Sequence, residues 1–170
     1  MLPSDVIRSS QRMPARMHSQ YLRSCYIDNE FSRGEFEVDG FKLDPEAVQV
    51  DAYVVGAVGD HIVPWASAYR TSQLLGGRNR FVLSSSGHIA GIVNPPNPKA
   101  RYWTNEQCSA RGAEEWLDGA EQHKETWWQD WARWMADHSG PLRSRPSTLG
   151  SPEYPVVGNA PGSYVSAVPH

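Results

Sequence analysis

The sequence has few of the features that mark secreted, membrane or nucleic-acid-binding proteins. Its two cysteines, Cys25 and Cys108, lie in unrelated contexts, which argues against a disulfide framework and against a cysteine metal site. No apolar run is long enough to cross a bilayer, and the N-terminus lacks the apolar core of a signal peptide. With a net charge of -3 at pH 7, the chain has no excess of basic residues to neutralise phosphates. We therefore expect a soluble cytoplasmic chain with no membrane span and no nucleic acid, metal ion or other cofactor bound.

Tryptophan, by contrast, is plentiful. The chain has seven tryptophans in 170 residues, and four of them fall between positions 127 and 134. That length suits one domain with a core, although the mean hydropathy of -0.55 is polar for a self-contained globule. By composition we expect three parts: a disordered start over 1–12, a folded part over 13–138, and an extended tail rich in proline and glycine over 139–170.

The centre of the chain predicts a strand–helix–strand unit. The run 48–56 is rich in β-branched residues and apolar on both faces toward its end, as in a buried strand of a mainly parallel sheet. Pro64 opens a helix over 65–75, because the N–H that proline lacks has no partner in the first turn. A second strand is predicted at 80–84. Connections this short indicate a βαβ unit, and hence an α/β fold with a mostly parallel sheet and flanking helices.

Further elements are expected on both sides of this unit. Helical spacing of apolar residues predicts a helix over 13–31, and a short hairpin is expected around 38–41. A short helix over 89–93 should end at Asn94-Pro95-Pro96. Between 113 and 138, tryptophan, leucine, alanine and methionine recur at three- and four-residue spacing with charged residues between them, which predicts one amphipathic helix. The positions of His18, His123 and His138 fit solvent-facing sides of helices.

An acidic residue and a histidine follow the two central strands. Asp60 comes after the first strand and His88 after the second. Open α/β sheets bind ligands at the edge where the carboxyl ends of their strands meet, so these side chains are placed to act together. The order acid then histidine is that of the α/β-hydrolase triad, in which the histidine takes the proton of a nucleophile and the carboxylate orients the ring. The alternative is turn chemistry, since aspartate often satisfies loop N–H groups.

Several stretches around this pair resemble class I polyhydroxyalkanoate synthases. They are Gly59-Asp60-His61-Ile62-Val63-Pro64-Trp65, Arg80-Phe81-Val82-Leu83 and Ser86-Gly87-His88-Ile89-Ala90-Gly91-Ile92-Val93-Asn94-Pro95-Pro96. The likeness continues through Tyr102-Trp103, Trp127-Trp128-x-x-Trp131 and Ala160-Pro161-Gly162-Ser163-Tyr164-Val165, and covers about residues 11 to 166. The resemblance implies that 13–138 is the C-terminal part of an α/β-hydrolase-type catalytic domain.

The resemblance also implies a reaction and its partners. The family polymerises (R)-3-hydroxyacyl-CoA, here expected to be 3-hydroxybutyryl-CoA, into a polyester and releases CoA. A cysteine in a lipase-like box carries the acyl group. His88 matches the general base toward that thiol, and Asp60 matches the triad acid, which is also proposed to activate the incoming hydroxyl. The expected partners are therefore the acyl-CoA, the growing polyester, the polyester granule, and an N-terminal synthase portion or a full-length synthase.

The family's nucleophile has no counterpart in this sequence. Neither Cys25 nor Cys108 has the flanking glycines of a tight elbow, and no serine lies in a Gly-x-Ser-x-Gly context. We therefore expect the early strands, the nucleophile elbow and the oxyanion donors to lie before Met1, and the chain to be inactive alone. The alternative is a non-catalytic fragment that binds granules or synthase through an exposed sheet edge and outward tryptophans. Against this, the tryptophan stripe is expected to pack on the sheet.

Overall fold

The computed structural model describes residues 13–106 and 112–163. Two compact units are present: Gln20–Gly140 forms one, and the described residues of the two terminal segments form the other. The disordered start predicted for 1–12 lies outside the described residues, as does Cys108. The larger unit contains the four-stranded sheet and the two residues singled out above, Asp60 and His88.

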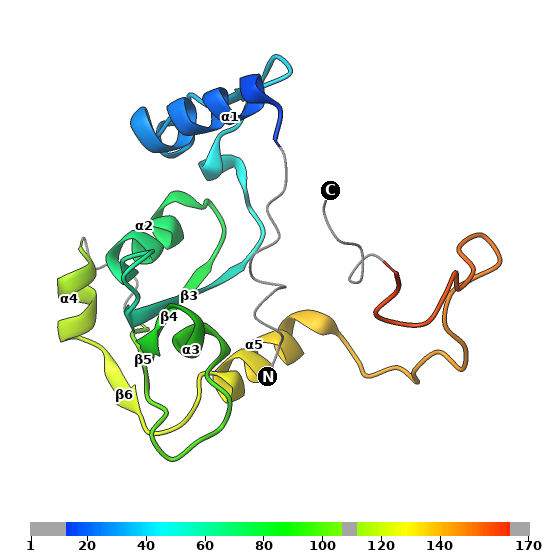
Figure 1. Cartoon of the computed structure of the whole chain (residues 1–170). Helices are drawn as coiled ribbons and strands as arrows, with labels where there is room; N and C mark the ends of the chain where they lie inside the picture. Colours follow the sequence, from blue (N-terminus) through cyan, green and yellow to red (C-terminus); the bar gives the residue numbers. More distant parts are fainter. Residues whose placement is uncertain (1–12, 107–111, 164–170) are drawn as a thin grey trace. The chain divides into compact units, whose positions relative to one another are not determined.

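The sheet has four strands in the order β3-β4-β5-β6. Strand β3 (Ala52–Gly59) runs parallel to β4 (Asn79–Gly87), and the helix α2 (Trp65–Leu74) connects them, as Figure 1 shows. The predicted βαβ unit and α/β class are confirmed. Two short strands that were not predicted, β5 (Tyr102–Thr104) and β6 (Glu121–His123), extend the sheet in antiparallel pairings.

The first central strand begins four residues later than predicted. Pairing with β4 starts at Ala52, which lies opposite Asn79. Just before it, the carboxylate of Asp51 accepts hydrogen bonds from the backbone N–H and the side chain of Arg78, at 3.2 and 3.0 Å. The Asp51 side chain thus accepts from a backbone N–H that would otherwise be available to a neighbouring strand, and the regular strand starts at the next residue.

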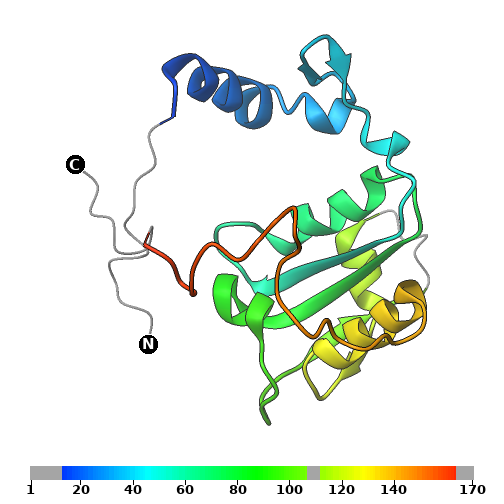
Figure 2. The ribbon, with the colours of Figure 1, turned by 90° about the vertical axis from the view of Figure 1, so that its right-hand side faces the viewer.

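One face of the sheet carries the main hydrophobic core. Phe81 and Leu83 are two residues apart in β4 and so point to the same face. They pack on Tyr69 of α2 and on Trp116 of α4 (Ala113–Asp118), and all four side chains are buried. The rings of Phe81 and Trp116 meet edge to face with centroids 4.9 Å apart. Figure 2 shows α2 on one side of the strands and α5 (Trp128–Ser139) on the other. Large aromatic side chains dominate such a core because each buries 150–250 Å² on average.

The second face is covered by α3 (His88–Val93) and α5. Tyr53 of β3 lies against Trp127 and Trp134, with centroids 6.1 and 5.6 Å apart. Its hydroxyl donates to Asp130 at 2.7 Å, and Arg80 clasps the same carboxylate with two hydrogen bonds of 2.8 and 2.7 Å. Burial by itself raises the pKa of Asp130, but the bonds from Arg80 and Tyr53 lower it overall. The buried carboxylate is therefore charged, and it fastens α5 to β3 and β4.

The prediction of a single helix between 113 and 138 is wrong. Helix α4 ends at Asp118, strand β6 follows, and α5 begins only at Trp128. The side-chain amide of Asn105 donates to the carbonyl of Trp116 at 2.8 Å and so satisfies a group that a continuing helix would have used. His123 accordingly does not face solvent from a helix: it lies in β6, where its ring stacks on Tyr102.

The tryptophans divide between the two predicted roles. Trp116 is fully buried, and Trp127 and Trp134 face the sheet. Beside them on α5, Trp128 and Trp131 remain 38% and 43% exposed, although the ring of Trp131 also contacts that of Trp127. The stripe is therefore mainly core, with an exposed aromatic edge.

The segment before the sheet is helical and then forms a hairpin. Helix α1 (Ala15–Tyr21) continues as a turn of π-helix over Leu22–Ile27, so the helix predicted for 13–31 is present but ends early. The predicted hairpin is confirmed as β1 (Glu37–Val38) and β2 (Phe41–Lys42). Its two turn residues, Asp39 and Gly40, have positive φ of 52° and 81°, as tight hairpin turns require.

After α5 the chain from Pro141 to Ser163 makes turns but neither helix nor strand. In the described ranges, no helix combines the length and the apolar character needed to span a membrane.

Candidate active site

Asp60 and His88 stand side by side at the carboxyl ends of β3 and β4. Gly59 and Gly87 are register partners in the parallel ladder, so the residues that follow them emerge next to each other. The Nδ1 atom of His88 lies 2.8 Å from Oδ2 of Asp60. A side chain at position 59 would be crowded, because its Cβ would lie 3.1 Å from the backbone oxygen of Ser86. The two residues that the sequence singled out are thus in direct contact.

The two oxygens of the Asp60 carboxylate have different hydrogen-bond partners. Oδ1 accepts hydrogen bonds from the backbone N–H groups of Ile62 and Val63, both at 2.9 Å, and Oδ2 accepts from His88. Burial raises the pKa of Asp60, but the bonds from Val63, His88 and Ile62 outweigh it and lower the pKa to about 2. The side chain is only 5% exposed. Turn chemistry and orientation of the histidine, the two interpretations of the sequence, are therefore both present in one residue.

The ring of His88 is poised to accept a proton from outside. A carboxylate with a pKa near 2 carries no proton at neutral pH, so Nδ1 of His88 must be the donor in the bond to Asp60. In the neutral ring the lone pair then lies on Nε2, which bonds to no residue in the described ranges. The His88 side chain is 39% exposed, so Nε2 can be reached. This is the arrangement of a general base whose ring is oriented by a carboxylate.

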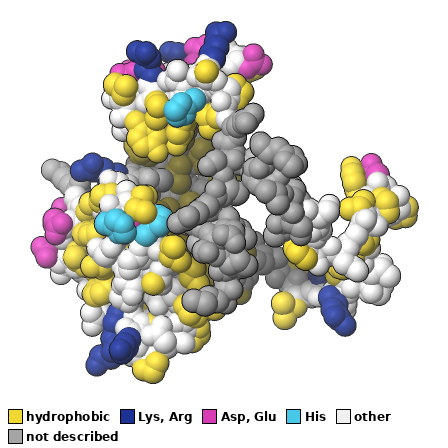
Figure 3. All heavy atoms as spheres, viewed as in Figure 1, with side chains coloured by type: hydrophobic (Ala, Val, Ile, Leu, Met, Phe, Trp, Pro, Cys, Tyr) yellow, Lys and Arg dark blue, Asp and Glu magenta, His cyan; other side chains and the backbone are white. Residues whose placement is uncertain are grey.

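Exposed apolar side chains flank Asp60 and His88 in the chain. Figure 3 shows hydrophobic side chains next to histidine atoms on the surface of the molecule. The exposed hydrophobic residues in and just after the end of β3 are Val58, Ile62 and Val63, and those on α3 are Ile89, Ile92 and Val93. Exposed apolar patches of this kind usually mark contact surfaces.

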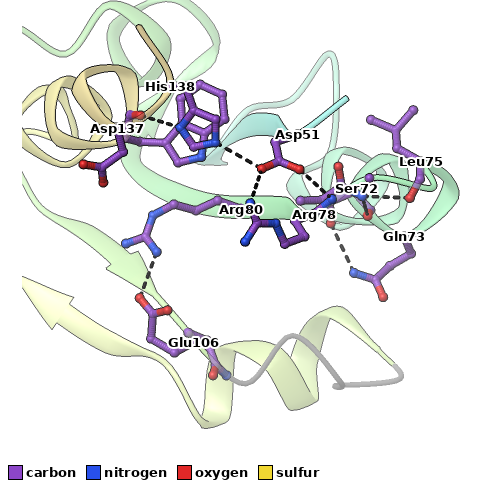
Figure 4. Close-up of a pocket in the computed structure, with 13 residues that line it drawn as sticks. Asp51, Ser72, Gln73, Leu75, Arg78, Arg80, Glu106, Asp137 and His138 are labelled. Carbon is purple, nitrogen blue, oxygen red and sulfur yellow. Dashed lines mark hydrogen bonds and ion pairs between the residues drawn. The ribbon is translucent and has the colours of Figure 1, made fainter. Parts of the chain in front are cut away.

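A second Asp–His pair lies at the opposite end of the sheet. Nε2 of His138 is 3.1 Å from Oδ2 of Asp51, next to Arg78, and Figure 4 shows them at a hollow of about 870 Å³. Nδ1 of His138 donates to the carbonyl of Trp134 at 2.6 Å. Both ring nitrogens therefore face acceptors, which favours the protonated ring and leaves no lone pair for catalysis. The carbonyl of Trp134 and the carboxylate of Asp51 raise the pKa of His138.

This second pair was not predicted, because 87 residues separate its members in the sequence. It is a clamp between α5 and the start of β3. The hollow at the clamp contains neither Asp60 nor His88, so its size does not make it the candidate active site.

The structure offers His88 no nucleophile from the cysteine it describes. Cys25 is a free, half-buried thiol in the π-helical turn, and no hydrogen bond joins it to His88 or Asp60. Among residues 13–106 and 112–163, no group of three or more histidine, cysteine, aspartate or glutamate side chains is arranged to hold a metal ion.

The sequence of this chain is similar to parts of known proteins. No family model matches it. It is 40% identical over 157 residues to a poly(3-hydroxyalkanoate) polymerase subunit of Cupriavidus necator and 41% identical over 157 residues to a poly(3-hydroxyalkanoate) polymerase of Ectopseudomonas oleovorans. A poly(3-hydroxyalkanoate) polymerase of Methylorubrum extorquens is 39% identical over 155 residues. These alignments cover 91–92% of this chain and 26–28% of each relative, so the chain spans about a quarter of the length of the curated relatives it matches. With such identity along nine-tenths of its sequence, the chain belongs to the poly(3-hydroxyalkanoate) polymerase family.

Proposed function

We propose that this chain supplies the Asp–His half of an acyltransferase site that polymerises (R)-3-hydroxyacyl-CoA, 3-hydroxybutyryl-CoA by preference, into polyester with release of CoA. One observation carries the proposal: His88 is held through Nδ1 by a charged, buried Asp60 while its Nε2 stays open. Membership of the polymerase family names the reaction that such a base would serve.

In the proposed first half-reaction His88 acts as base and then as acid. Nε2 takes the proton of a cysteine thiol, and the thiolate attacks the thioester carbonyl of the acyl-CoA. When the carbon–sulfur bond to CoA breaks, the CoA sulfur leaves with the proton from Nε2. The acyl group is then bound to the cysteine and His88 is neutral again. Asp60 keeps its charge and stabilises the ring while it carries the proton.

In the second half-reaction we assign the same base to the hydroxyl of the incoming hydroxyacyl unit. Nε2 takes the hydroxyl proton, the oxygen attacks the acyl-cysteine, and the thiolate leaves and recovers the proton. Asp60 is a poor candidate for this task, because a group with a pKa of about 2 is a weak base and its side chain is almost fully buried. The resemblance implied Asp60 as the activator of the hydroxyl, whereas the open Nε2 favours His88 for this role.

The nucleophile must come from elsewhere in this account. The sequence has no cysteine or serine flanked by the glycines of a nucleophile elbow. We infer that the chain alone turns over no acyl-CoA, and that it works in the cytoplasm at polyester granules together with a synthase portion that carries the cysteine box.

The second candidate function is non-catalytic binding to a synthase or to granules. The observation that favours it is a partly exposed edge of α5, along which Trp128, Trp131 and Met135 follow one another about one helical turn apart. Such a role does not need Asp60 or His88. Association with full-length synthase that survives alanine at both positions but is lost on replacing Trp128 and Trp131 would support it.

The test of the catalytic proposal is thiol release from 3-hydroxybutyryl-CoA. The chain alone should release no CoA, and a mixture with a separately expressed polymerase segment bearing a Gly-x-Cys-x-Gly box should release it. The same mixture with His88→Gln should be inactive. Release by the chain alone would overturn the missing-nucleophile argument, and equal release with His88→Gln would overturn the assigned base.

A further inference from the structure

The helix that begins with His88 is too short to hold itself in place. Helix α3 has six residues, whereas isolated helices below about 12–15 residues are marginal in water. His88 is its first residue and Asn94 follows its last, with φ of 25°. The direction in which His88 points therefore depends on what fastens the far end of α3.

A buried polar network fastens that end. The side-chain amide of Asn94 donates to Oγ of Ser84 in β4 at 2.9 Å. The backbone carbonyl of Asn94 accepts a hydrogen bond from the hydroxyl of Thr126. Asn94, Ser84 and Thr126 are only 4%, 0% and 1% exposed, so water cannot replace any of these partners.

A second contact reaches the middle of the helix. The indole N–H of Trp127 donates to the backbone carbonyl of Gly91 at 3.2 Å. On its other side Gly91 lies directly on β3, because a Cβ at this position would stand 2.5 Å from Cβ of Ala57. Trp127 and β3 thus hold α3 from two sides.

We propose that Thr126 and Trp127 are positioning residues for His88: by binding Asn94 and Gly91 they orient α3 so that the ring stays in hydrogen bond with Asp60. Neither residue is joined to Asp60 or His88 by a hydrogen bond, and both act through the helix backbone. The inference deepens the proposed function and rests on it for its importance to catalysis, but the geometric claim is independent of turnover.

Removing the Thr126 hydroxyl has a definite physical consequence. The carbonyl of Asn94 is left buried without that donor, and the strain is relieved if the end of α3 moves. A hydrogen bond loses most of its strength when donor and acceptor separate to about 3.6 Å, so a small rotation of α3 is enough to release His88 from Asp60. In catalysis, a misplacement of about 1 Å costs on the order of 100-fold in rate.

The experiment reads the tautomer of His88 by ¹⁵N NMR in the 170-residue chain, at a pH above the titration of its ring. Asp60 should hold the wild-type ring as the Nδ1–H form, whereas a free imidazole prefers the Nε2–H form. Thr126→Val keeps the shape of the side chain and should shift His88 toward the Nε2–H form. Thr126→Ser restores the hydroxyl and should restore the wild-type tautomer.

Thr104→Val is the matched control. It removes a buried threonine hydroxyl of β5 that is bonded to His123 of β6, and should leave the tautomer of His88 unchanged. Trp127→Phe is the second variant, which keeps an aromatic ring but removes the N–H, and it decides the matter if Thr126→Val does not fold. The inference is overturned if His88 keeps the wild-type tautomer in a folded Thr126→Val chain. If Thr126→Val does not fold, the wild-type tautomer in Trp127→Phe overturns it. An equal shift of the tautomer in Thr104→Val also overturns it.

The same variants separate this inference from the proposed function. In a polymerase that carries this chain in place of its matched segment, Thr126→Val should lower kcat by about 10- to 100-fold with little change in KM. If the tautomer shifts but the polymerase lacks activity even with the wild-type chain, the proposed function fails and the positioning role stands. If the polymerase is active and the tautomer does not shift, the positioning role fails alone.

Discussion

Asp60 accepts a hydrogen bond of 2.8 Å from His88, 28 residues further along the chain. The contact follows from the ladder, because Gly59 and Gly87 are register partners and each is followed by one member of the pair. Among the residues that the structure describes, only Nδ1 of this histidine has a hydrogen-bond partner. This distinguishes the pair from Asp51 and His138, where both ring nitrogens are bound to acceptors.

Replacement of Asp60 by asparagine should abolish most of the proposed activity. The variant keeps the size of the side chain but loses the charge that orients and stabilises the ring, and the equivalent change in a serine-protease triad costs about 10⁴-fold in kcat. We expect a loss of about 10³- to 10⁴-fold in CoA release from a polymerase carrying this chain. Asp51→Asn is the matched control, since it alters the other Asp–His pair, and it should change kcat by only a few-fold. Equal losses in the two variants would show a general effect on folding instead.

The Asp60 carboxylate should also leave a signature in acid. Its pKa falls from 3.8 in the reference state to about 2 in the folded chain, so its charged form stabilises the fold at any pH above about 4. That contribution should disappear as the pH falls from about 4 to about 2. Urea unfolding of wild type and Asp60→Asn should give a difference in unfolding free energy that is constant near neutrality and shrinks over this acid range. A difference that stays constant down to the acid end of the range would contradict the lowered pKa.

The His138 clamp predicts the opposite dependence. Its pKa is raised above 6.5, so the charged ring stabilises the fold below that value, and this contribution is lost as the pH rises through the folded pKa. On the acid side the window closes where Asp51, whose pKa is lowered, takes up its proton. The difference in unfolding free energy between wild type and His138→Gln should therefore be largest in mildly acid solution and fall toward alkaline pH. A difference that grows toward alkaline pH would refute the charged clamp.

Gly91 should tolerate no larger residue. A Cβ at this position would lie 2.5 Å from Cβ of Ala57 and 3.0 Å from the backbone oxygen of Ser85, so α3 must move away from β3. Overpacking of this kind costs about 1–3 kcal/mol. Gly91→Ala should lower the urea midpoint accordingly, while Gly158→Ala, where no atom lies within 4 Å of the added Cβ, should leave it nearly unchanged. Equal midpoints for Gly91→Ala and wild type would mean that the helix does not pack this closely.

The sequence predicted the parts of the fold that depend on local pattern. The β-branched run 48–56 predicted β3, the run 80–84 predicted β4, Pro64 marked the start of α2, and the hairpin at Asp39-Gly40 followed from turn chemistry. The placement of Asp60 and His88 at one sheet edge needed only the rule that parallel strands end together. Their catalytic role stays a prediction.

The features that the sequence did not reveal depend on partners far away in the chain. Tyr102–Thr104 is too short to stand out as a strand, and it exists because β4 and β6 pair with it. The amphipathic pattern on either side of 119–127 predicted one continuous helix, but the pairing of β6 with β5 and the cap from Asn105 interrupt it there. The clamp between Asp51 and His138 and the bond between Thr126 and Asn94 join side chains that no local pattern connects.

The measurement that tests the central claim most directly is polymer formation by a chimera. The matched quarter of the Cupriavidus necator polymerase would be replaced by this chain, and CoA release and polyester would be measured with 3-hydroxybutyryl-CoA. The account predicts an active chimera that loses activity with His88→Gln, while the 170-residue chain alone releases no CoA. A chimera that polymerises equally well with glutamine at position 88 would contradict the claim that His88, held by Asp60, is the base of the reaction.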